Sequence, residues 1–85
     1  MRLDICWEEF APFLVSDGKQ SEGSMPANKS RFNIMVRWFE GKELDRKTFN
    51  IFIYELKQTG YSPSYLNNFI KLAKHIFKYL SIRLR

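Results

Sequence analysis

The chain has 85 residues, of which 45% are apolar, and its eight Phe and two Trp are enough for the core of one small domain. No apolar run approaches the ~20 residues needed to cross a bilayer, and a single Cys and a single His exclude an internal disulfide and a Cys/His metal cluster. We expect one domain over residues 1–85 that needs no membrane, no metal and no cofactor.

The net charge of +5 is unevenly distributed along the chain. Residues 1–25 hold two basic and five acidic side chains, a net charge of −3, whereas residues 26–85 hold twelve basic and four acidic ones, a net charge of +8. Basic charge concentrated on the later elements is typical of a domain that turns one side towards phosphates.

An apolar stripe near the N-terminus predicts a first helix. Asp4 is placed to cap this helix, and Pro12 is expected to kink or shorten it. The stripe consists of Trp7, Phe10, Phe13 and Leu14. Residues 16–24 contain no apolar side chain, so they predict a loop, and a mobile one.

A second helix is predicted after this loop, with Ser24 as its cap and Pro26 in its first turn. Its buried stripe is predicted to be Phe32, Met35, Val36 and Phe39. Ile34 and Trp38 fall on or beside the outward side, where we expect another helix to cover them. The outward side is predicted to carry Ser30, Asn33 and Arg37, with Lys29 and Arg31 at its edges, which makes this helix a second candidate for binding a polyanion.

The third helix has a well-specified start and end. Asp45 can cap it, while Leu44 can contact Phe49 across the cap as a hydrophobic staple. Its predicted apolar stripe is Phe49, Phe52, Ile53 and Leu56. Gly60 can then adopt the left-handed conformation that often ends a helix.

The fourth helix begins at once, because Ser62 can accept hydrogen bonds from its first free amides and Pro63 suits the first helical position. The stripe predicted to face the core is Leu66, Phe69, Ile70, Ala73, Phe77 and Leu80. The opposite side is predicted to carry Ser64, Asn68, Lys71, His75 and Lys78, with Asn67 and Lys74 on its flank. No acidic residue interrupts this face, which favours a polyanionic partner.

The sequence predicts an all-α fold, because no segment alternates convincingly as a strand would. The order and spacing of its motifs resemble the N-terminal core-binding domain, also called SAM-like, of tyrosine recombinases and phage integrases. In this sequence the motifs are Trp38-Phe39, Phe52-x3-Leu56-x3-Gly60-x-Ser62-x2-Tyr65 and Lys74-x2-Phe77-x2-Leu80. Two residues depart from the family pattern: Tyr65 stands where Thr is usual, and Asn28 where an aromatic residue is common.

The resemblance implies a compact four-helix SAM-like bundle that holds one side of duplex DNA. It implies that a separate catalytic domain, absent from residues 1–85, grips the other side and supplies the chemistry, so we expect no enzymatic activity from this chain alone. The implied partners are double-stranded DNA, the catalytic domain of the same protein and other recombinase protomers, in the cytoplasm on a bacterial nucleoid. The implied DNA contacts on the second helix are Lys29, Ser30, Arg31 and Arg37. Those on the fourth helix are Ser62, Ser64, Asn67, Asn68, Lys71, Lys74, His75 and Lys78.

Two alternatives from other classes stay open at this point. In the first, Ile34 and Trp38 form an apolar docking patch of a helical protein-interaction module, and the lysines only keep it soluble. In the second, a small regulator reads DNA with the fourth helix as the recognition helix of a helix-turn-helix unit, joined through Gly60 to Ser62.

Overall fold

The computed structural model describes residues 2–18 and 21–83. Over these residues the chain forms four α-helices, one short 3-10 helix and no strand, which confirms the prediction of an all-α fold. The elements are α1 (Trp7–Ser16), η1 (Glu22–Ser24), α2 (Met25–Trp38), α3 (Arg46–Gln58) and α4 (Pro63–Arg83). None of the described helices combines the length and apolar character that crossing a membrane requires.

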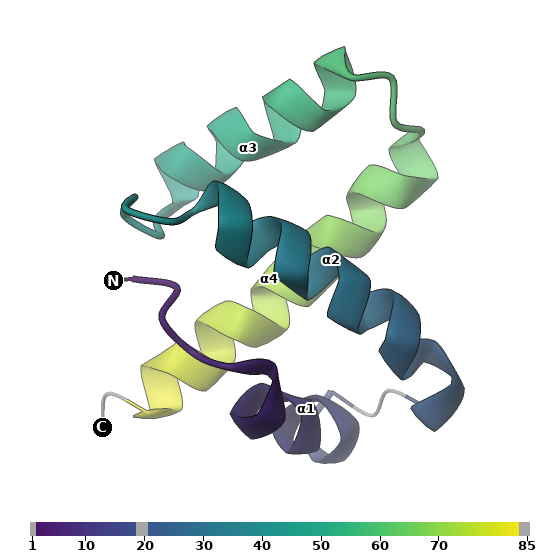
Figure 1. Cartoon of the computed structure of the whole chain (residues 1–85), viewed down its shortest axis with the longest axis vertical. Helices are drawn as coiled ribbons and strands as arrows, with labels where there is room; N and C mark the ends of the chain where they lie inside the picture. The colour runs from purple at the N-terminus through teal and green to yellow at the C-terminus, as the bar shows by residue number, and fades with distance from the viewer. Residues whose placement is uncertain (1, 19–20, 84–85) are drawn as a thin grey trace.

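The helices are arranged in a thin bundle whose Cα atoms extend over 33 × 29 × 16 Å. Figure 1 looks down the shortest of these axes and shows α2 crossing in front of α4, with α3 at one end and α1 at the other. Because α4 also contacts α1, α2 and α3, it is the element around which the bundle is organised.

The junction between α3 and α4 follows the predicted local signals. The Asp45 carboxylate accepts a hydrogen bond from the backbone N–H of Thr48 at 2.7 Å, which caps α3. Gly60 has φ = +97° just beyond the end of that helix, a conformation that glycine adopts without the steric cost of a Cβ. The Ser62 hydroxyl accepts a hydrogen bond from the N–H of Tyr65 at 3.2 Å, so the predicted cap of α4 is confirmed.

The predicted cap of the first helix is wrong. The helix begins at Trp7, after Cys6, whose N–H donates to the Glu9 carboxylate at 3.2 Å. Asp4 lies in the preceding extended segment, which allows Ile5 to reach the core with only 5% of its surface exposed. Burial of the Ile5 side chain stabilises the extended conformation of this segment. Pro12 lies inside α1, and the helix continues to Ser16.

The loop predicted over residues 16–24 is only partly a loop. Residues 22–24 form η1, and α2 follows directly with Pro at the start of its first turn. Ser24 holds the cap position as predicted, but its hydroxyl donates to the carbonyl oxygen of Ser21 at 2.9 Å. Of the loop predicted to be mobile over residues 16–24, residues 19–20 lie outside the described residues.

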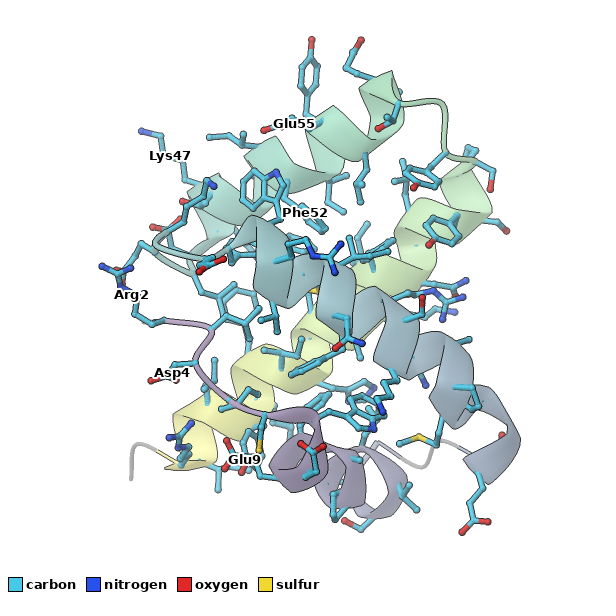
Figure 2. All side chains as sticks on the ribbon, viewed as in Figure 1. Arg2, Asp4, Glu9, Lys47, Phe52 and Glu55 are labelled. Atoms are coloured by element: carbon cyan, nitrogen blue, oxygen red, sulfur yellow. The ribbon has the colours of Figure 1, made fainter. Side chains whose placement is uncertain are left out.

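The core is dominated by aromatic rings from all four helices. Phe52 of α3 is fully buried, and its ring centroid lies 5.6 Å from that of Phe39 and 5.5 Å from that of Phe69 on α4. Phe10 of α1 stacks on Phe32 of α2 at 5.5 Å. Figure 2 shows Phe52 directed into the bundle, whereas Lys47 on the same helix points away from it. These rings join the two ends of the bundle into one core.

The rotation of α4 about its own axis differs from the predicted one. Leu72 and Ile76 are buried, although the predicted stripe does not contain them. Ile70 and Phe77, which the predicted stripe does contain, are only half-buried. The remaining predicted positions, Leu66, Phe69, Ala73 and Leu80, are buried as expected. The inward face is therefore turned towards the side on which α1 and α2 pack, and the outward face is turned by the same amount.

Helix α2 shows one unpredicted buried polar residue. Asn28 is 8% exposed, and it occupies the position where an aromatic residue was expected from the resemblance. Val36, predicted to be core, is half-buried. Ile34 and Trp38 are half-buried and pack against the core, which confirms that helix packing covers them.

Candidate nucleic-acid interface

The outward face of α4 carries an exposed row of polar side chains. Asn67, Lys71, Lys74 and Lys78 are all exposed and follow one another in steps of four, three and four residues. At about 100° per residue such steps keep side chains on one side of a helix. We call these four residues the α4 stripe. Asn67 and Lys74, predicted to lie on the flank, belong to this exposed row because of the rotation of α4.

The last cation of the α4 stripe is paired within the chain. Lys78 Nζ lies 2.8 Å from the Asp17 carboxylate at the end of α1. Arg83, farther along α4, lies 3.5 Å from both Asp4 and Glu9. The acidic N-terminal segment thus partly neutralises the C-terminal end of α4. Because these pairs are solvent-exposed, each stabilises by only about 0–1 kcal/mol, and phosphates can compete for the cations.

His75 and Asn68 are less available than predicted. Both are half-buried, since the rotation of α4 moves them towards the helices that pack on it. A Cβ at Gly18 would lie 3.1 Å from Cε1 of His75, so the imidazole packs against the end of α1. The structure therefore places both residues at the border of the exposed face of α4, and His75 lies beside the backbone of Gly18.

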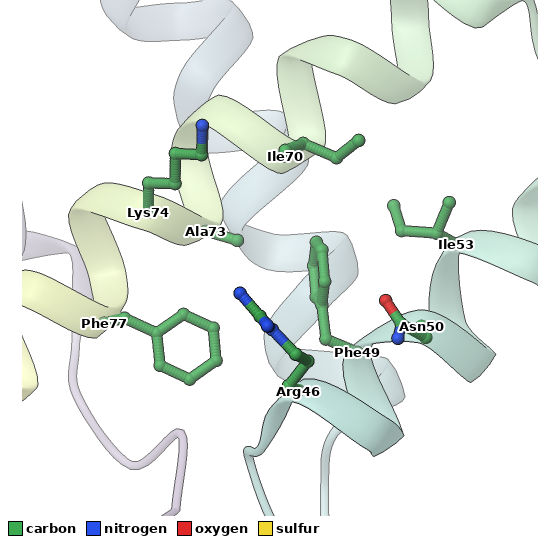
Figure 3. Close-up of a pocket in the computed structure, with 8 residues that line it drawn as sticks. All are labelled: Arg46, Phe49, Asn50, Ile53, Ile70, Ala73, Lys74 and Phe77. Atoms are coloured by element: carbon green, nitrogen blue, oxygen red, sulfur yellow. The ribbon is translucent and has the colours of Figure 1, made fainter.

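The candidates on α2 lie on the other broad face of the molecule. Lys29, Ser30 and Arg37 are exposed. Helices α2 and α4 contact each other and turn their buried faces inward, so their outward faces point in opposite directions. In Figure 3, which shows Lys74 on the near side of α4, α2 runs behind α3 and α4. The structure does not bring the two predicted basic sets together into one surface.

Arg31 is a packed side chain and not a free cation. Its guanidinium donates to the Asn28 side-chain oxygen at 3.4 Å and lies 5.5 Å from the centre of the Tyr65 ring. Its Nε is buried without a hydrogen-bond partner. Tyr65 also stacks on Tyr61 at 4.7 Å, so the residue that departs from the family pattern anchors an Arg–Tyr–Tyr cluster between α2 and the start of α4.

The polar residues at the start of α4 have unequal roles. Ser62, Ser64 and Asn67 are exposed, but the Ser62 hydroxyl is already engaged as the helix cap. No acidic side chain lies in the first turn of α4. The free backbone amides at a helix N-terminus favour anions, so this end of α4 is electrostatically compatible with the α4 stripe.

A groove between α3 and α4 brings in a cation that the sequence did not single out. Figure 3 shows Arg46, the first residue of α3, directed towards α4 on the same side as Lys74. Asn50 is the third polar residue of this α3–α4 groove, whose apolar walls are Phe49, Ile53, Ile70, Ala73 and Phe77. Spacing along one helix cannot reveal this arrangement, because Arg46 and Lys74 belong to different helices.

The apolar patch expected for a protein-interaction module is largely occupied. The Trp38 indole packs on Phe39 and Phe52, and its N–H donates to Glu55 at 3.5 Å. Lys42 Nζ donates to the Trp38 carbonyl oxygen at 2.9 Å and lies 4.7 Å from the centre of its ring. Trp38 is therefore held in place by residues of its own chain.

Comparison of the chain with models of protein families, with curated proteins and with solved structures finds no match.

Proposed function

We propose that this chain binds double-stranded DNA through the α4 stripe and Arg46, as the core-binding domain of a tyrosine recombinase or phage integrase. In this proposal the four helices form a SAM-like bundle on one side of the duplex. A catalytic domain of the same protein grips the other side, and further protomers bind alongside on the nucleoid. The domain itself positions the DNA and carries out no chemistry.

The observation that carries the proposal is the cluster of unpaired cations on one face. Within residues 2–18 and 21–83, Lys71, Lys74 and Arg46 have no acidic partner. Phosphate contacts by Lys and Arg supply most of the affinity of non-specific DNA binding. Lysine is a compact point charge that suits phosphates more than the bidentate recognition of guanine. We therefore assign this face to the DNA backbone and not to base reading.

The bundle geometry favours α4 over α2 as the contact surface. A duplex lying on the α4 face does not reach the outward side of α2, where Arg37 lies opposite the buried positions and Lys29 lies at the edge. This departs from the expectation that both helices meet the DNA. Asn67 is the member of the α4 stripe whose amide can both donate to and accept from a base edge.

A pair of matched double variants tests the proposal. Lys71→Ala with Lys74→Ala removes two positive charges from the α4 face, and Lys29→Ala with Arg37→Ala removes two from the α2 face. Binding to a labelled duplex, followed by fluorescence anisotropy, should weaken strongly for the first variant and only slightly for the second. Equal weakening would mean that net charge alone decides the affinity, and the proposed interface would then be wrong.

A further inference from the structure

The α3–α4 groove has the dimensions of a ligand site. Its volume is about 580 Å³, within the range of roughly 300–1,000 Å³ that is usual for small-molecule pockets. We propose that this groove binds a small apolar acid, namely an aromatic body that carries one carboxylate. The proposal concerns a ligand other than DNA and does not rest on the proposed function.

The walls of the groove account for the apolar part of the ligand. Phe49 and Ala73 are buried at 8% and 3% exposure and form the deeper part. Ile53, Ile70 and Phe77 are half-buried around them. These three residues belong to the apolar stripes that the sequence assigns to the core, yet the bundle leaves them partly exposed. An aromatic body in the groove would remove their remaining apolar surface from water, which is favourable.

The two cations of the groove account for the acidic part. Arg46 comes from α3 and Lys74 from α4, so they approach the apolar walls from the two helices, and Figure 3 shows the Arg46 side chain reaching over the groove between Phe77 and Phe49. Among the described residues neither cation has an acidic partner. The planar guanidinium of Arg46 matches a carboxylate, Lys74 adds a second positive charge at the α4 rim of the groove, and the exposed Asn50 amide can donate one more hydrogen bond.

The chemistry of the groove separates this ligand from a phosphate of DNA or a simple anion. Phosphate contacts need cations but no apolar walls, whereas an apolar acid uses both. The two requirements can be varied independently with three probes. Naphthalene-2-carboxylate has the apolar body and the charge, naphthalene-2-carboxamide has only the body, and acetate has only the charge.

The experiment titrates each probe into the 15N-labelled chain and follows the backbone amides by NMR. The carboxylate should saturate, with shifts concentrated on residues of the groove. The carboxamide should bind about tenfold more weakly because it loses the charge-assisted hydrogen bonds. Acetate should cause no saturable shift over the same concentration range. A carboxamide or acetate that binds as tightly as the naphthoate would overturn the proposal.

Variants assign the binding to the groove. Arg46→Ala should raise the dissociation constant of the carboxylate about tenfold, and Lys74→Ala should raise it by a smaller factor because the Lys74 ammonium group is directed away from Arg46. Lys47→Ala is the matched control, because Lys47 neighbours Arg46 but points away from the bundle (Figure 2), and it should leave the constant unchanged. Equal losses in all three variants, or a concentration-dependent dimer that Arg46→Ala abolishes, would contradict the proposal. The dimer would assign the groove to a second copy of the chain.

Discussion

The salt dependence of duplex binding tests how many cations of the α4 face meet phosphates. Among residues 2–18 and 21–83, Lys71, Lys74 and Arg46 have no acidic partner, whereas Lys78 lies 2.8 Å from Asp17. For B-DNA the logarithm of the binding constant falls with the logarithm of salt concentration, with a slope of about −0.9 for each phosphate neutralised. Three phosphate contacts therefore predict a slope of about −2.7.

The corresponding change in affinity is large enough to measure. A rise from about 50 to about 200 mM salt should weaken binding roughly 40-fold. In the Lys71→Ala, Lys74→Ala double variant one free cation remains, so the slope should fall to about −0.9 and the same rise in salt should weaken binding only about 3.5-fold. Anisotropy titrations at several salt concentrations give both slopes, and circular dichroism checks that the variant is folded.

The control is the Lys29→Ala, Arg37→Ala double variant, which changes the net charge by the same amount. Its slope should stay near that of the unmodified chain, because α2 faces away from the bound duplex. A slope for the α4 variant that equals that of the unmodified chain would refute the phosphate contacts of Lys71 and Lys74. A slope near −3.6 for the unmodified chain would show that Lys78 leaves Asp17 and joins the interface.

Three further predictions concern the elements that position this face. Phe52→Ala should lower the free energy of unfolding by about 3–5 kcal/mol in urea denaturation, because it opens a cavity where three helices meet; a loss below about 1 kcal/mol would show that the core collapses around the site. Gly60→Ala should cost about 1–2 kcal/mol in the same assay, because φ = +97° is unfavourable for a residue with a Cβ, and a neutral result would mean that the turn relaxes. Asp45→Ala should lower the melting temperature near neutral pH. The hydrogen bond from the Thr48 backbone lowers the pKa of Asp45 below its ordinary value of 3.8. Its stabilisation is therefore present above pH 3.8 and is lost as the pH falls through the lowered pKa, so the difference between variant and unmodified chain should shrink in acid; a difference independent of pH would exclude this charged cap.

Local signals in the sequence were sufficient to define the junction that places α4. The cap at Asp45, the left-handed Gly60 and the cap at Ser62 all occur as predicted, because each depends on hydrogen bonds or backbone conformation within a few residues. The start of α1 was predicted incorrectly for a tertiary reason. Burial of Ile5 favours an extended segment where Asp4 alone predicted a cap.

The sequence by itself determined that the chain is helical, where most of its helices begin and end, and that basic charge gathers on the later ones. Only the tertiary structure decided which residues share a surface. Apolar residues cover a wide arc of α4, so periodicity could not choose between an inward face containing Ile70 and Phe77 and one containing Leu72 and Ile76. Packing against α1 and α2 made that choice. The same packing pairs Lys78 with Asp17, separates the cations of α2 from those of α4, and places Arg46 and Lys74 along one groove. The sequence does not predict these arrangements, because contacts between segments far apart in the chain produce no periodic pattern of residues.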